Sequence, residues 1–424
     1  MGGLLGTLML NQRLPRHDLE SLNWQKRKRL VTYAFENVPI YRKKYLEAGL
    51  LPSDIRSPED FEKLPIIRRE DLRNDFGNFL SRDARPSLLK ISTTGGSTGM
   101  PVKVMHDRRI PLDAFRLRMF SWWGIDPCVD VAYVWRGPMS LIKIVVYQLV
   151  SWPTRRIFLD ASSMTEDNIR RFLRGLNRLE SAVLTGYVGA IHHLALFAEE
   201  NHLDVRPPKA VWVTSSPLSE VHRTRMERVF RAPVYDQYGS CEILWIAAQC
   251  QERTGLHIFY DSRYLECVDE KDESVPQGKL GRILVTDLEN FLFPLIRYEN
   301  GDQGRLLPES CPCGISLPLM DKVSGRVSDM ILLPEKTSIA GEYLTTIFDR
   351  FPDAVAEFQV RQKKDLSLNV LYVPATHDDV ALSKVLASVE EELVKRTRGY
   401  VSITFEQKAA IPHNRGKLQF VIRE

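Results

Sequence analysis

The segment Thr93-Thr94-Gly95-Gly96-Ser97-Thr98-Gly99-Met100-Pro101 comes shortly after the apolar stretch Leu88-Leu89-Lys90-Ile91. Its three glycines let backbone N–H groups turn toward one point, and its Ser and Thr hydroxyls add donors, which suits the binding of phosphate oxygens. It is not a Walker A loop, because that motif ends in Gly-Lys-Ser/Thr and Gly99 is followed here by Met100-Pro101. Taken alone, a loop of this composition is more often an ordinary turn. The phosphate-binding interpretation therefore depends on what else the chain contains.

Length and composition set the broad class. A chain of 424 residues exceeds one typical domain and predicts two or three domains, with an α/β fold as the default. The hydrophobic share of 44% and the charged share of 26% are those of a globular protein and exclude wholesale disorder. The 58 Lys and Arg against 54 Asp and Glu leave a net charge of only +4, which does not indicate a nucleic-acid surface.

The N-terminal residues match neither of two common targeting patterns. The first ten residues lack the early positive charge and the cleavage site of a signal peptide, and Gly6 stands where a myristoylation pattern needs Ser or Thr. The most apolar run, from Leu141 to Val150, contains Lys143 and is too short to span a bilayer. Two of the six cysteines form Cys311-Pro312-Cys313, which favours reduced thiols or a metal over a disulfide framework. We expect a cytoplasmic protein with neither a nucleic-acid nor a membrane partner.

The order of predicted elements indicates a largely parallel sheet. Residues from Leu19 to Phe79 are helical in pattern, and Ser57-Pro58-Glu59-Asp60 predicts a helix start with Ser57 as N-cap and Asp60 in the capping-box place. Short β-branched or aromatic runs at 132–135, 182–185 and 210–214 then alternate with helix-like stretches, as in βαβ units. After Asp329 two helical and several strand-like runs predict a small α+β domain of about 95 residues.

Five short segments decide the resemblance when taken together. Tyr238-Gly-Ser-Cys-Glu242 stands at an expected strand end, where ligands bind in open α/β sheets, although each segment alone is more simply a turn with an N-cap. In sequence and order, the five segments resemble the core motifs of adenylate-forming enzymes: Thr94 to Pro101, Tyr238 to Glu242, Tyr298-Glu-Asn-Gly-Asp302, Gly325-Arg326-Val-Ser-Asp329 and Gly416-Lys417. Flanking matches narrow the resemblance to the phenylacetate-CoA ligase family and its CapK-like relatives, from about Leu22 to Ile422. These are Ala34-Phe-Glu-Asn-Val-Pro-Ile-Tyr41, Lys63-Leu-Pro65, Thr214-Ser-Ser-Pro-Leu218, Pro294-Leu-Ile-Arg-Tyr298 and Cys311-Pro-Cys-Gly314.

The resemblance implies a domain plan. Residues 1–324 would form an N-terminal domain that binds ATP and a carboxylate, with mixed and parallel sheets flanked by helices and a helical segment to about residue 90. Residues 325–329 would be a hinge. Residues 330–424 would form a small α+β lid domain that rotates between adenylation and transfer.

The resemblance also implies the roles of individual residues. Lys417 would bridge the substrate carboxylate and the α-phosphate, and Glu242 would bind Mg²⁺. Tyr238 would pack on adenine and Asp302 would accept hydrogen bonds from the ribose hydroxyls. The remaining nucleotide contacts would come from Thr94, Gly95, Gly96, Ser97, Thr98, Gly99, Gly239, Ser240 and Arg326. Met100 stands where many members carry a lysine, and Lys103 would replace that lysine in contacting phosphate. Ser328 stands where the best-known members have Asp or Lys at the hinge pivot, so the pivot residue is left unassigned.

Two further groups of residues complete the predicted sites. The carboxylate pocket would be lined by Tyr187, Ser215, Ser216, Tyr235 and Gln237. A structural Zn²⁺ would be held by Cys250, His257, Cys311 and Cys313, a closed Cys₃His set that several family members share in similar form. The alternative is that these thiols and this imidazole are in ordinary packing.

These residues together predict an ATP-dependent ligase. It would convert a carboxylic acid to an acyl or aryl adenylate with release of pyrophosphate, and then pass the acyl group to coenzyme A. One alternative passes it to an amine, in a secondary-metabolite or polysaccharide pathway. Another is a nucleotide-binding homologue without chemistry, against which Glu242, Asp302 and Lys417 argue. The sequence does not determine the acid, the acceptor, the pathway or the oligomeric state, although a dimer is common among the resembling enzymes.

Overall fold

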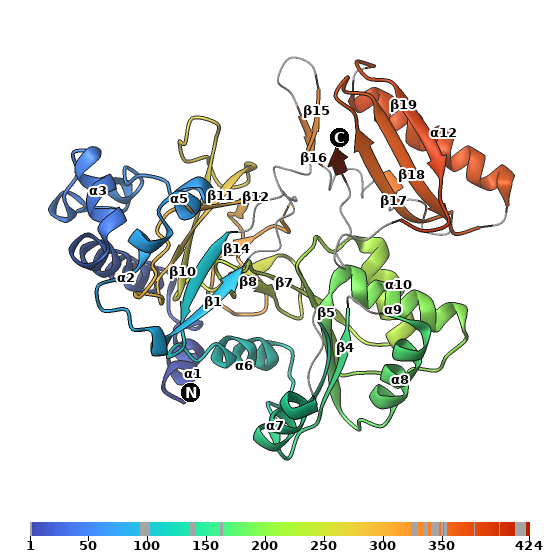
Figure 1. Cartoon of the computed structure of the whole chain (residues 1–424), viewed down its shortest axis with the longest axis horizontal. Coiled ribbons are helices and arrows are strands. Elements are labelled where there is room, and N and C mark those ends of the chain that lie inside the picture. Colours follow the sequence, from blue (N-terminus) through green and yellow to red (C-terminus); the bar gives the residue numbers. More distant parts are fainter. Residues whose placement is uncertain are drawn as a thin grey trace. The chain divides into compact units, whose positions relative to one another are not determined.

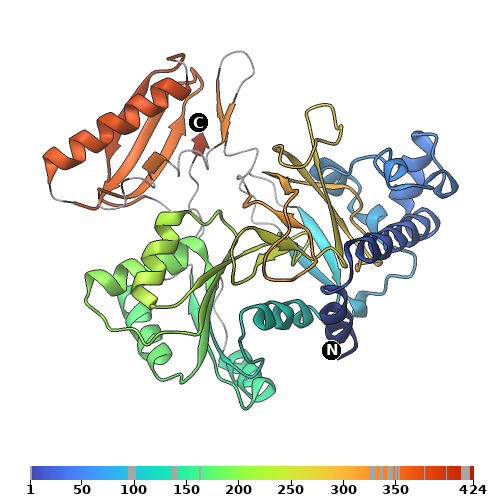
Figure 2. The same cartoon turned by 180° about the vertical axis from the view of Figure 1, so that it is seen from behind.

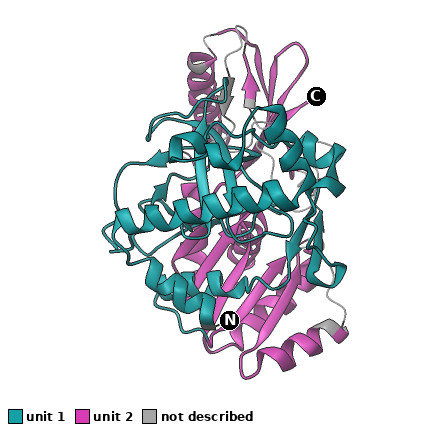
Figure 3. Cartoon of the chain, turned by 90° about the vertical axis from the view of Figure 1, so that its left-hand side faces the viewer, with its two compact units in different colours: residues 1–127, 237–323 teal, residues 128–236, 324–424 magenta. Residues whose placement is uncertain are grey.

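The computed structural model describes residues 2–93, 102–135, 141–161, 164–323, 330–333, 338–340, 347–348, 351, 354–376, 378–397, 399–411 and 421–424. The chain divides into two compact units, one of residues 1–127 with 237–323 and the other of residues 128–236 with 324–424 (Figure 3). The predicted hinge, 325–329, lies outside the described residues, so the predicted domain limits stay a prediction.

The second unit begins with the predicted parallel sheet. Its strands β3 (Asp130–Trp135), β4 (Arg156–Asp160), β5 (Ala182–Tyr187) and β6 (Ala210–Thr214) lie in the order β6-β5-β3-β4, and β4 is an edge strand. The pairs β3–β4, β3–β5 and β5–β6 are parallel, which confirms the βαβ interpretation. Alternate strand residues such as Val134, Leu184 and Val213 share one hydrophobic core with the helices α8 (Glu166–Asn177), α9 (Val188–Glu200) and α10 (Glu220–Phe230) (Figure 1). The helix α7 (Leu141–Ser151) lies between β3 and β4 in the chain.

The first unit combines helices with antiparallel strands. Its helices are α1 (Gly2–Asn11), α2 (Arg16–Asn37), α3 (Pro39–Glu47), α4 (Pro58–Phe61), α5 (Arg69–Asn74) and α6 (Asp113–Trp122). The predicted capping box starts α4, because the Ser57 hydroxyl accepts from the Asp60 N–H and the Asp60 carboxylate accepts from the Ser57 N–H. The strands β10 (Arg263–Val268), β11 (Gly281–Asp287) and β12 (Tyr298–Gly304) form an antiparallel sheet. Its residues pack with Leu30, Val31 and Tyr41 of α2 and α3 in one core.

Shorter strands complete this unit. The strands β1 (Leu89–Thr93) and β2 (Lys103–Asp107) pair antiparallel. The strand β7 (Val234–Tyr238), inside which the division between the units falls, is followed by β8 (Ala247–Gln249), β9 (Leu256–Ile258), β13 (Leu306–Leu307) and β14 (Leu319–Met320). The strands β8, β9, β13 and β14 pair antiparallel in the order β13-β14-β9-β8, and β8 also pairs with the end of β7.

The C-terminal part of the chain has the predicted α+β composition. The strands β17 (Val355–Gln362), β18 (Leu368–Pro374), β19 (Ile403–Gln407) and β20 (Val421–Arg423) form a sheet in the order β19-β18-β17-β20. The helix α12 (Asp379–Arg396) covers one face of it, as Figure 2 shows, and contributes Val389 and Leu393 to a shared core. The strands β15 (Met330–Leu332) and β16 (Ser338–Ala340) form an antiparallel pair.

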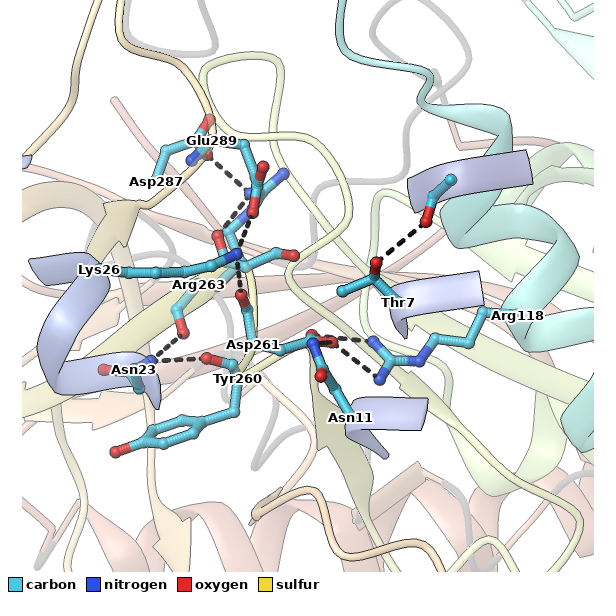
Figure 4. A network of polar contacts seen from close by, with 12 residues as sticks. Thr7, Asn11, Asn23, Lys26, Arg118, Tyr260, Asp261, Arg263, Asp287 and Glu289 are labelled. Carbon is cyan, nitrogen blue, oxygen red and sulfur yellow. Dashed lines mark hydrogen bonds and ion pairs between the residues drawn. The ribbon is translucent and has the colours of Figure 1, made fainter. Parts of the chain in front are cut away.

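A buried polar network holds the N-terminal helices (Figure 4). The guanidinium of Arg118 on α6 donates to both carboxylate oxygens of Asp261, at 2.9 and 3.1 Å, and both side chains are fully buried. Asn11 of α1 also donates to Asp261, and Arg118 donates to the Leu8 carbonyl oxygen. The pairing satisfies two charges that would be costly to bury alone, and it attaches α1 to α6 and to the turn before β10.

Among the helices of the described part of the chain, none is both long and apolar enough to cross a bilayer.

Candidate functional site

A tight turn after β7 carries Gly239, Ser240 and Glu242. A Cβ at Gly239 would lie 2.9 Å from Nε2 of Gln237 and 3.1 Å from the Trp245 nitrogen, so a larger residue does not fit there without rearrangement. Ser240 closes the turn, because its N–H donates to the Ile243 carbonyl oxygen and its hydroxyl accepts from the Ile243 N–H at 3.0 Å. The turn brings Glu242 back beside the end of β7.

Tyr238 and Asp302, both predicted to contact the nucleotide, are in direct contact. The Tyr238 hydroxyl donates to Oδ2 of Asp302 at 2.8 Å, and Asn300 donates to the same hydroxyl oxygen. Burial, together with the Asp302 charge, raises the pKa of Tyr238 well above its usual value, so the phenol stays neutral and remains a donor. The hydrogen bond therefore fixes the Tyr238 ring and the Asp302 carboxylate relative to each other.

Glu242 is held by two donors. Its side chain is 1% exposed, and its Oε1 lies 3.2 Å from Nη2 of Arg69 and 3.2 Å from the Tyr298 hydroxyl. The same Arg69 nitrogen donates to the Asn300 carbonyl oxygen at 3.0 Å. Both donors contact Oε1, and no residue in the described ranges donates to Oε2. The arrangement leaves one oxygen of a buried carboxylate for a ligand.

The sequence predicted no role in this site for Arg69, Tyr298 or Asn300. A signal for two of them was present, since Tyr298, Asn300 and Asp302 alternate along β12 and share one side of it. Arg69 has no such signal, because it comes from α5, 173 positions before Glu242.

The segment expected to bind phosphate, Thr94, Gly95, Gly96, Ser97, Thr98 and Gly99, lies outside the described residues, as do Arg326 and Lys417. The two ends of the segment are described, however. Thr93 of β1 pairs with Lys103 of β2, so the residues on either side of the segment lie side by side. His106 of β2 donates from Nε2 to the Cys241 carbonyl oxygen at 2.9 Å. Burial lowers the pKa of His106, which favours the neutral imidazole. The hairpin is therefore tied to the turn that carries Glu242.

The residues of the predicted carboxylate pocket lie at or just after the ends of β5 and β6, and on β7. Tyr187 ends β5 and pairs with Thr214, which ends β6, so Tyr187 and Ser215 lie at the carboxyl edge of the parallel sheet. The Tyr187 ring meets Trp135, the last residue of β3, edge to face at 4.8 Å. Ser215 has φ of +77°, a strained conformation for a residue other than glycine, and such strain often marks functional sites. Ser216 follows directly in the same turn, and Tyr235 and Gln237 are buried on β7.

The four predicted zinc ligands lie together. Their ligand atoms are all within 4.8 Å of one another. The sulfurs of Cys250 and Cys311 are 3.5 Å apart, and Cys313 Sγ is 3.3 Å from Nε2 of His257. Nδ1 of His257 donates to the Leu317 carbonyl oxygen at 3.1 Å, which fixes the tautomer that presents a lone pair at Nε2. Burial lowers the pKa of His257 to about 4, so this imidazole is neutral, as a metal ligand must be.

The pKa values of the three thiols in this cluster are shifted in different directions. Burial raises the pKa of Cys250 above its usual value and that of Cys313 to about 12. Burial acts in the same direction on Cys311, but hydrogen bonds led by that of Thr254 lower its pKa overall. Thiolates buried at these distances repel one another unless a positive ion lies between them.

Comparisons with known proteins identify relatives of the whole chain. No model of a known protein family matches the chain. A phenylacetate-coenzyme A ligase of Thermus thermophilus is 25% identical over 366 residues, which cover 84% of this chain and 81% of that protein. One from Escherichia coli is 26% identical over 338 residues, covering 74% and 73%. The chain is a homologue of phenylacetate-coenzyme A ligases. Protein CapK of Staphylococcus aureus is also similar, at 23% identity over all of this chain and 96% of that one.

Solved structures show the fold. A 2-hydroxyisobutyryl-CoA ligase in the postadenylation state, in complex with 2-HIB-AMP, matches with a TM-score of 0.81 and 21% identity. That match covers 98% of this chain and 91% of the other. An amide bond synthetase, McbA of Marinactinospora thermotolerans, matches with a TM-score of 0.55 and 17% identity over 78% of this chain and 67% of the other. The predicted α/β fold of adenylate-forming ligases, with its small C-terminal domain, is confirmed.

Proposed function

We propose that this protein is an AMP-forming ligase that activates a carboxylic acid with ATP. The carboxylate oxygen would attack the α-phosphorus of ATP, the bond to the β-phosphate would break, and pyrophosphate would leave. The observation that supports this most directly is the hydrogen-bond network beside the end of β7. Tyr238 donates to Asp302, Asn300 donates to Tyr238, and Arg69 donates to both Glu242 and the Asn300 carbonyl oxygen.

Each of these residues has a role in the proposal. Tyr238 and Asp302 would bind the nucleoside, the ring by stacking and the carboxylate by accepting hydroxyl hydrogens. Glu242 would hold Mg²⁺, for which a carboxylate oxygen is a suitable ligand and which would neutralise charge on the phosphates. The loop from Thr94 to Gly99 would donate to phosphate oxygens, Arg326 would contact the nucleotide, and Lys417 would neutralise charge at the reacting carboxylate.

The acceptor in the second half-reaction is proposed to be coenzyme A. The homologues at 25% and 26% identity are named as coenzyme A ligases. The second candidate is an amine, because an amide bond synthetase shares the fold. The acid would bind at the carboxyl edge of the parallel sheet near Tyr187, Ser215 and Ser216, with Tyr235 and Gln237.

We also propose that Cys250, His257, Cys311 and Cys313 hold a structural Zn²⁺. A Cys₃His set leaves no position for a reacting water, so the ion would stabilise the fold between β8 and β14 rather than take part in catalysis. The proposed location is the cytoplasm, whose reducing conditions suit six cysteines that are all free thiols.

Pyrophosphate exchange over a panel of carboxylic acids tests the first half-reaction. We expect exchange that requires both Mg²⁺ and one class of acid. The active acid would then be incubated with ATP and either coenzyme A or amines, and the product identified by mass spectrometry. ATP binding without exchange on any acid of a broad panel would instead support the nucleotide-binding homologue without chemistry.

A further inference from the structure

The segment that carries Arg69 is fixed alongside β12. The Ile67 N–H donates to the Arg297 carbonyl oxygen at 3.1 Å, and the Glu299 N–H donates to the Ile67 carbonyl oxygen at 2.9 Å. The two hydrogen bonds form a parallel bridge, as a short added strand would. Arg69 begins α5 two residues later, so the start of this helix is attached to the strand that carries Asn300.

Ion pairs fix the same segment through the side chain of Arg68. This guanidinium donates to both carboxylate oxygens of Asp272, at 3.0 and 2.7 Å, and its Nε lies 3.3 Å from Glu299. Arg282 donates to the same two carboxylates, at 2.6 Å to Asp272 and 2.8 Å to Glu299. The four side chains therefore form a closed ring whose charges cancel. Arg69 is left outside this ring, and its own charge is available to another carboxylate.

The carboxylate next to Arg69 is that of Glu242. Nη2 of Arg69 is shared between Oε1 of Glu242, at 3.2 Å, and the Asn300 carbonyl oxygen, at 3.0 Å. The Arg69 side chain is 17% exposed and that of Glu242 is 1% exposed, so little water screens the pair. Because a guanidinium stays protonated in proteins, a permanent positive charge lies beside the carboxylate proposed to bind Mg²⁺. With Asp302, whose charge also acts on Arg69, the three side chains carry one net negative charge.

This fixed charge distinguishes two forms of the metal. Free Mg²⁺ would bring two positive charges to a carboxylate that is already paired, and Arg69 would repel it. The complex of Mg²⁺ with a nucleoside triphosphate carries net negative charge, so Arg69 would attract it. At an effective dielectric constant of about 20, charges a few ångströms apart change a binding constant by more than about tenfold. The same residue therefore weakens binding of the free cation and strengthens that of its nucleotide complex.

On the basis of the metal-binding role proposed for Glu242, we propose that Arg69 determines the form in which the metal binds. It keeps free divalent cations from Glu242 and admits Mg²⁺ only together with the phosphates of the nucleotide. Mg²⁺ is commonly held by one or two carboxylates together with substrate phosphates, which agrees with a carboxylate that has one oxygen left for a ligand. Since the bridge to β12 and the ring through Arg68 hold the start of α5, the positive charge is in place before the nucleotide binds.

Electron paramagnetic resonance of Mn²⁺ tests this without an activity measurement. Mn²⁺ takes the same oxygen ligands as Mg²⁺, and the signal of the free ion decreases when it binds. For the natural chain we expect no saturable binding of Mn²⁺ alone below millimolar concentration, and clear binding of Mn²⁺ with ATP. Arg69→Met and Arg69→Gln, the second of which keeps an N–H donor without the charge, should each bind Mn²⁺ alone at least about tenfold more tightly. Adding Glu242→Gln to Arg69→Gln should remove this gain.

Two variants serve as controls. Arg69→Lys keeps the positive charge, and Arg16→Met breaks an exposed arginine–glutamate pair, that with Glu20, so neither should bind Mn²⁺ alone more tightly than the natural chain does. Saturable binding of Mn²⁺ alone to the natural chain that Glu242→Gln abolishes would overturn the proposal, and so would a folded Arg69→Gln without any gain. Equal binding of Mn²⁺ with ATP to the natural chain and to Glu242→Gln would overturn the metal role of Glu242 itself, and the role of Arg69 with it.

Discussion

The hydroxyl of Tyr238 donates a 2.8 Å hydrogen bond to the carboxylate of Asp302, although 64 positions separate the two residues. One residue ends β7 and the other lies on β12. This hydrogen bond links the residue proposed to stack on adenine to the residue proposed to accept from the ribose hydroxyls. A substitution at Tyr238 is therefore expected to alter how Asp302 binds the nucleotide.

Tyr238→Phe should weaken ATP binding while preserving the ring. Without the hydroxyl, the Asp302 carboxylate loses a donor that orients it, and we expect a roughly tenfold rise in KM for ATP with a smaller change in kcat. Initial rates against ATP concentration measure this. Tyr41→Phe is a matched control, since that hydroxyl is also buried and bonded, but to the Pro294 carbonyl oxygen and the Ile296 N–H rather than to a proposed nucleotide residue. Its loss should lower stability alone. An unchanged KM in Tyr238→Phe would contradict the role.

Arg69→Met should destabilise the empty protein. It leaves the Glu242 carboxylate buried without its counter-ion, and breaking a buried pair costs about 3 kcal/mol or more. Arg69→Lys should recover part of this, and so should Mg²⁺ with ATP, since the metal supplies positive charge at the same carboxylate. Thermal unfolding with and without Mg²⁺ and ATP measures both effects. The neighbouring Arg68 pairs with Asp272 at the surface, so Arg68→Met should cost less than about 1 kcal/mol. Equal losses of stability in Arg69→Met and Arg68→Met would contradict a stabilising buried ion pair between Arg69 and Glu242.

Zinc removal should lower the melting temperature. Metal binding is linked to folding, so a strong chelator, or Cys313→Ser, is expected to reduce thermal stability and release about one zinc per chain. Elemental analysis and a thiol-reactive reagent provide the measurement. Cys267→Ser is the control, because this buried thiol lies apart from the cluster and contacts the Gly304 carbonyl oxygen. Well under one zinc per purified chain would refute the site.

Asp261→Asn should be strongly destabilising. It leaves the Arg118 guanidinium fully buried without a charge partner, at a cost of about 3–5 kcal/mol. Urea unfolding gives the free energy, and limited proteolysis should show α1 released first, because Arg118 and Asp261 hold that helix. The exposed pair Arg16–Glu20 is the comparison, and Glu20→Gln should change stability by less than about 0.5 kcal/mol.

Lys417→Ala should abolish pyrophosphate exchange and leave ATP binding nearly intact. The lysine is proposed to act on charge that develops in the transition state, so its loss lowers turnover much more than ground-state affinity. Exchange assays and calorimetric titration with ATP separate the two quantities. Exchange at the natural rate would remove Lys417 from the mechanism.

Local sequence alone was enough for much of the fold. The alternation of runs between residues 130 and 214 predicted the parallel strands β3, β5 and β6, because side-chain periodicity is a local property of helices and strands. The capping box of Ser57 and Asp60 was predicted for the same reason. The roles of Thr94 to Gly99, Arg326 and Lys417 still rest on resemblance.

Tertiary structure decided what local patterns cannot encode. Cys250, His257, Cys311 and Cys313 were named together from the sequence, but only the pairing of β9 with β8 and β14 places their ligand atoms within 4.8 Å. Arg69 meets Glu242 across 173 positions, a contact that no short pattern contains. The run from Leu141 to Val150 was apolar in the sequence, yet the exposure of Ile142 and Leu149 within it follows from the attachment of α7 through its other residues Gln148 and Tyr147. Hydrophobicity belongs to the residue, whereas burial depends on which surfaces the folded chain brings together.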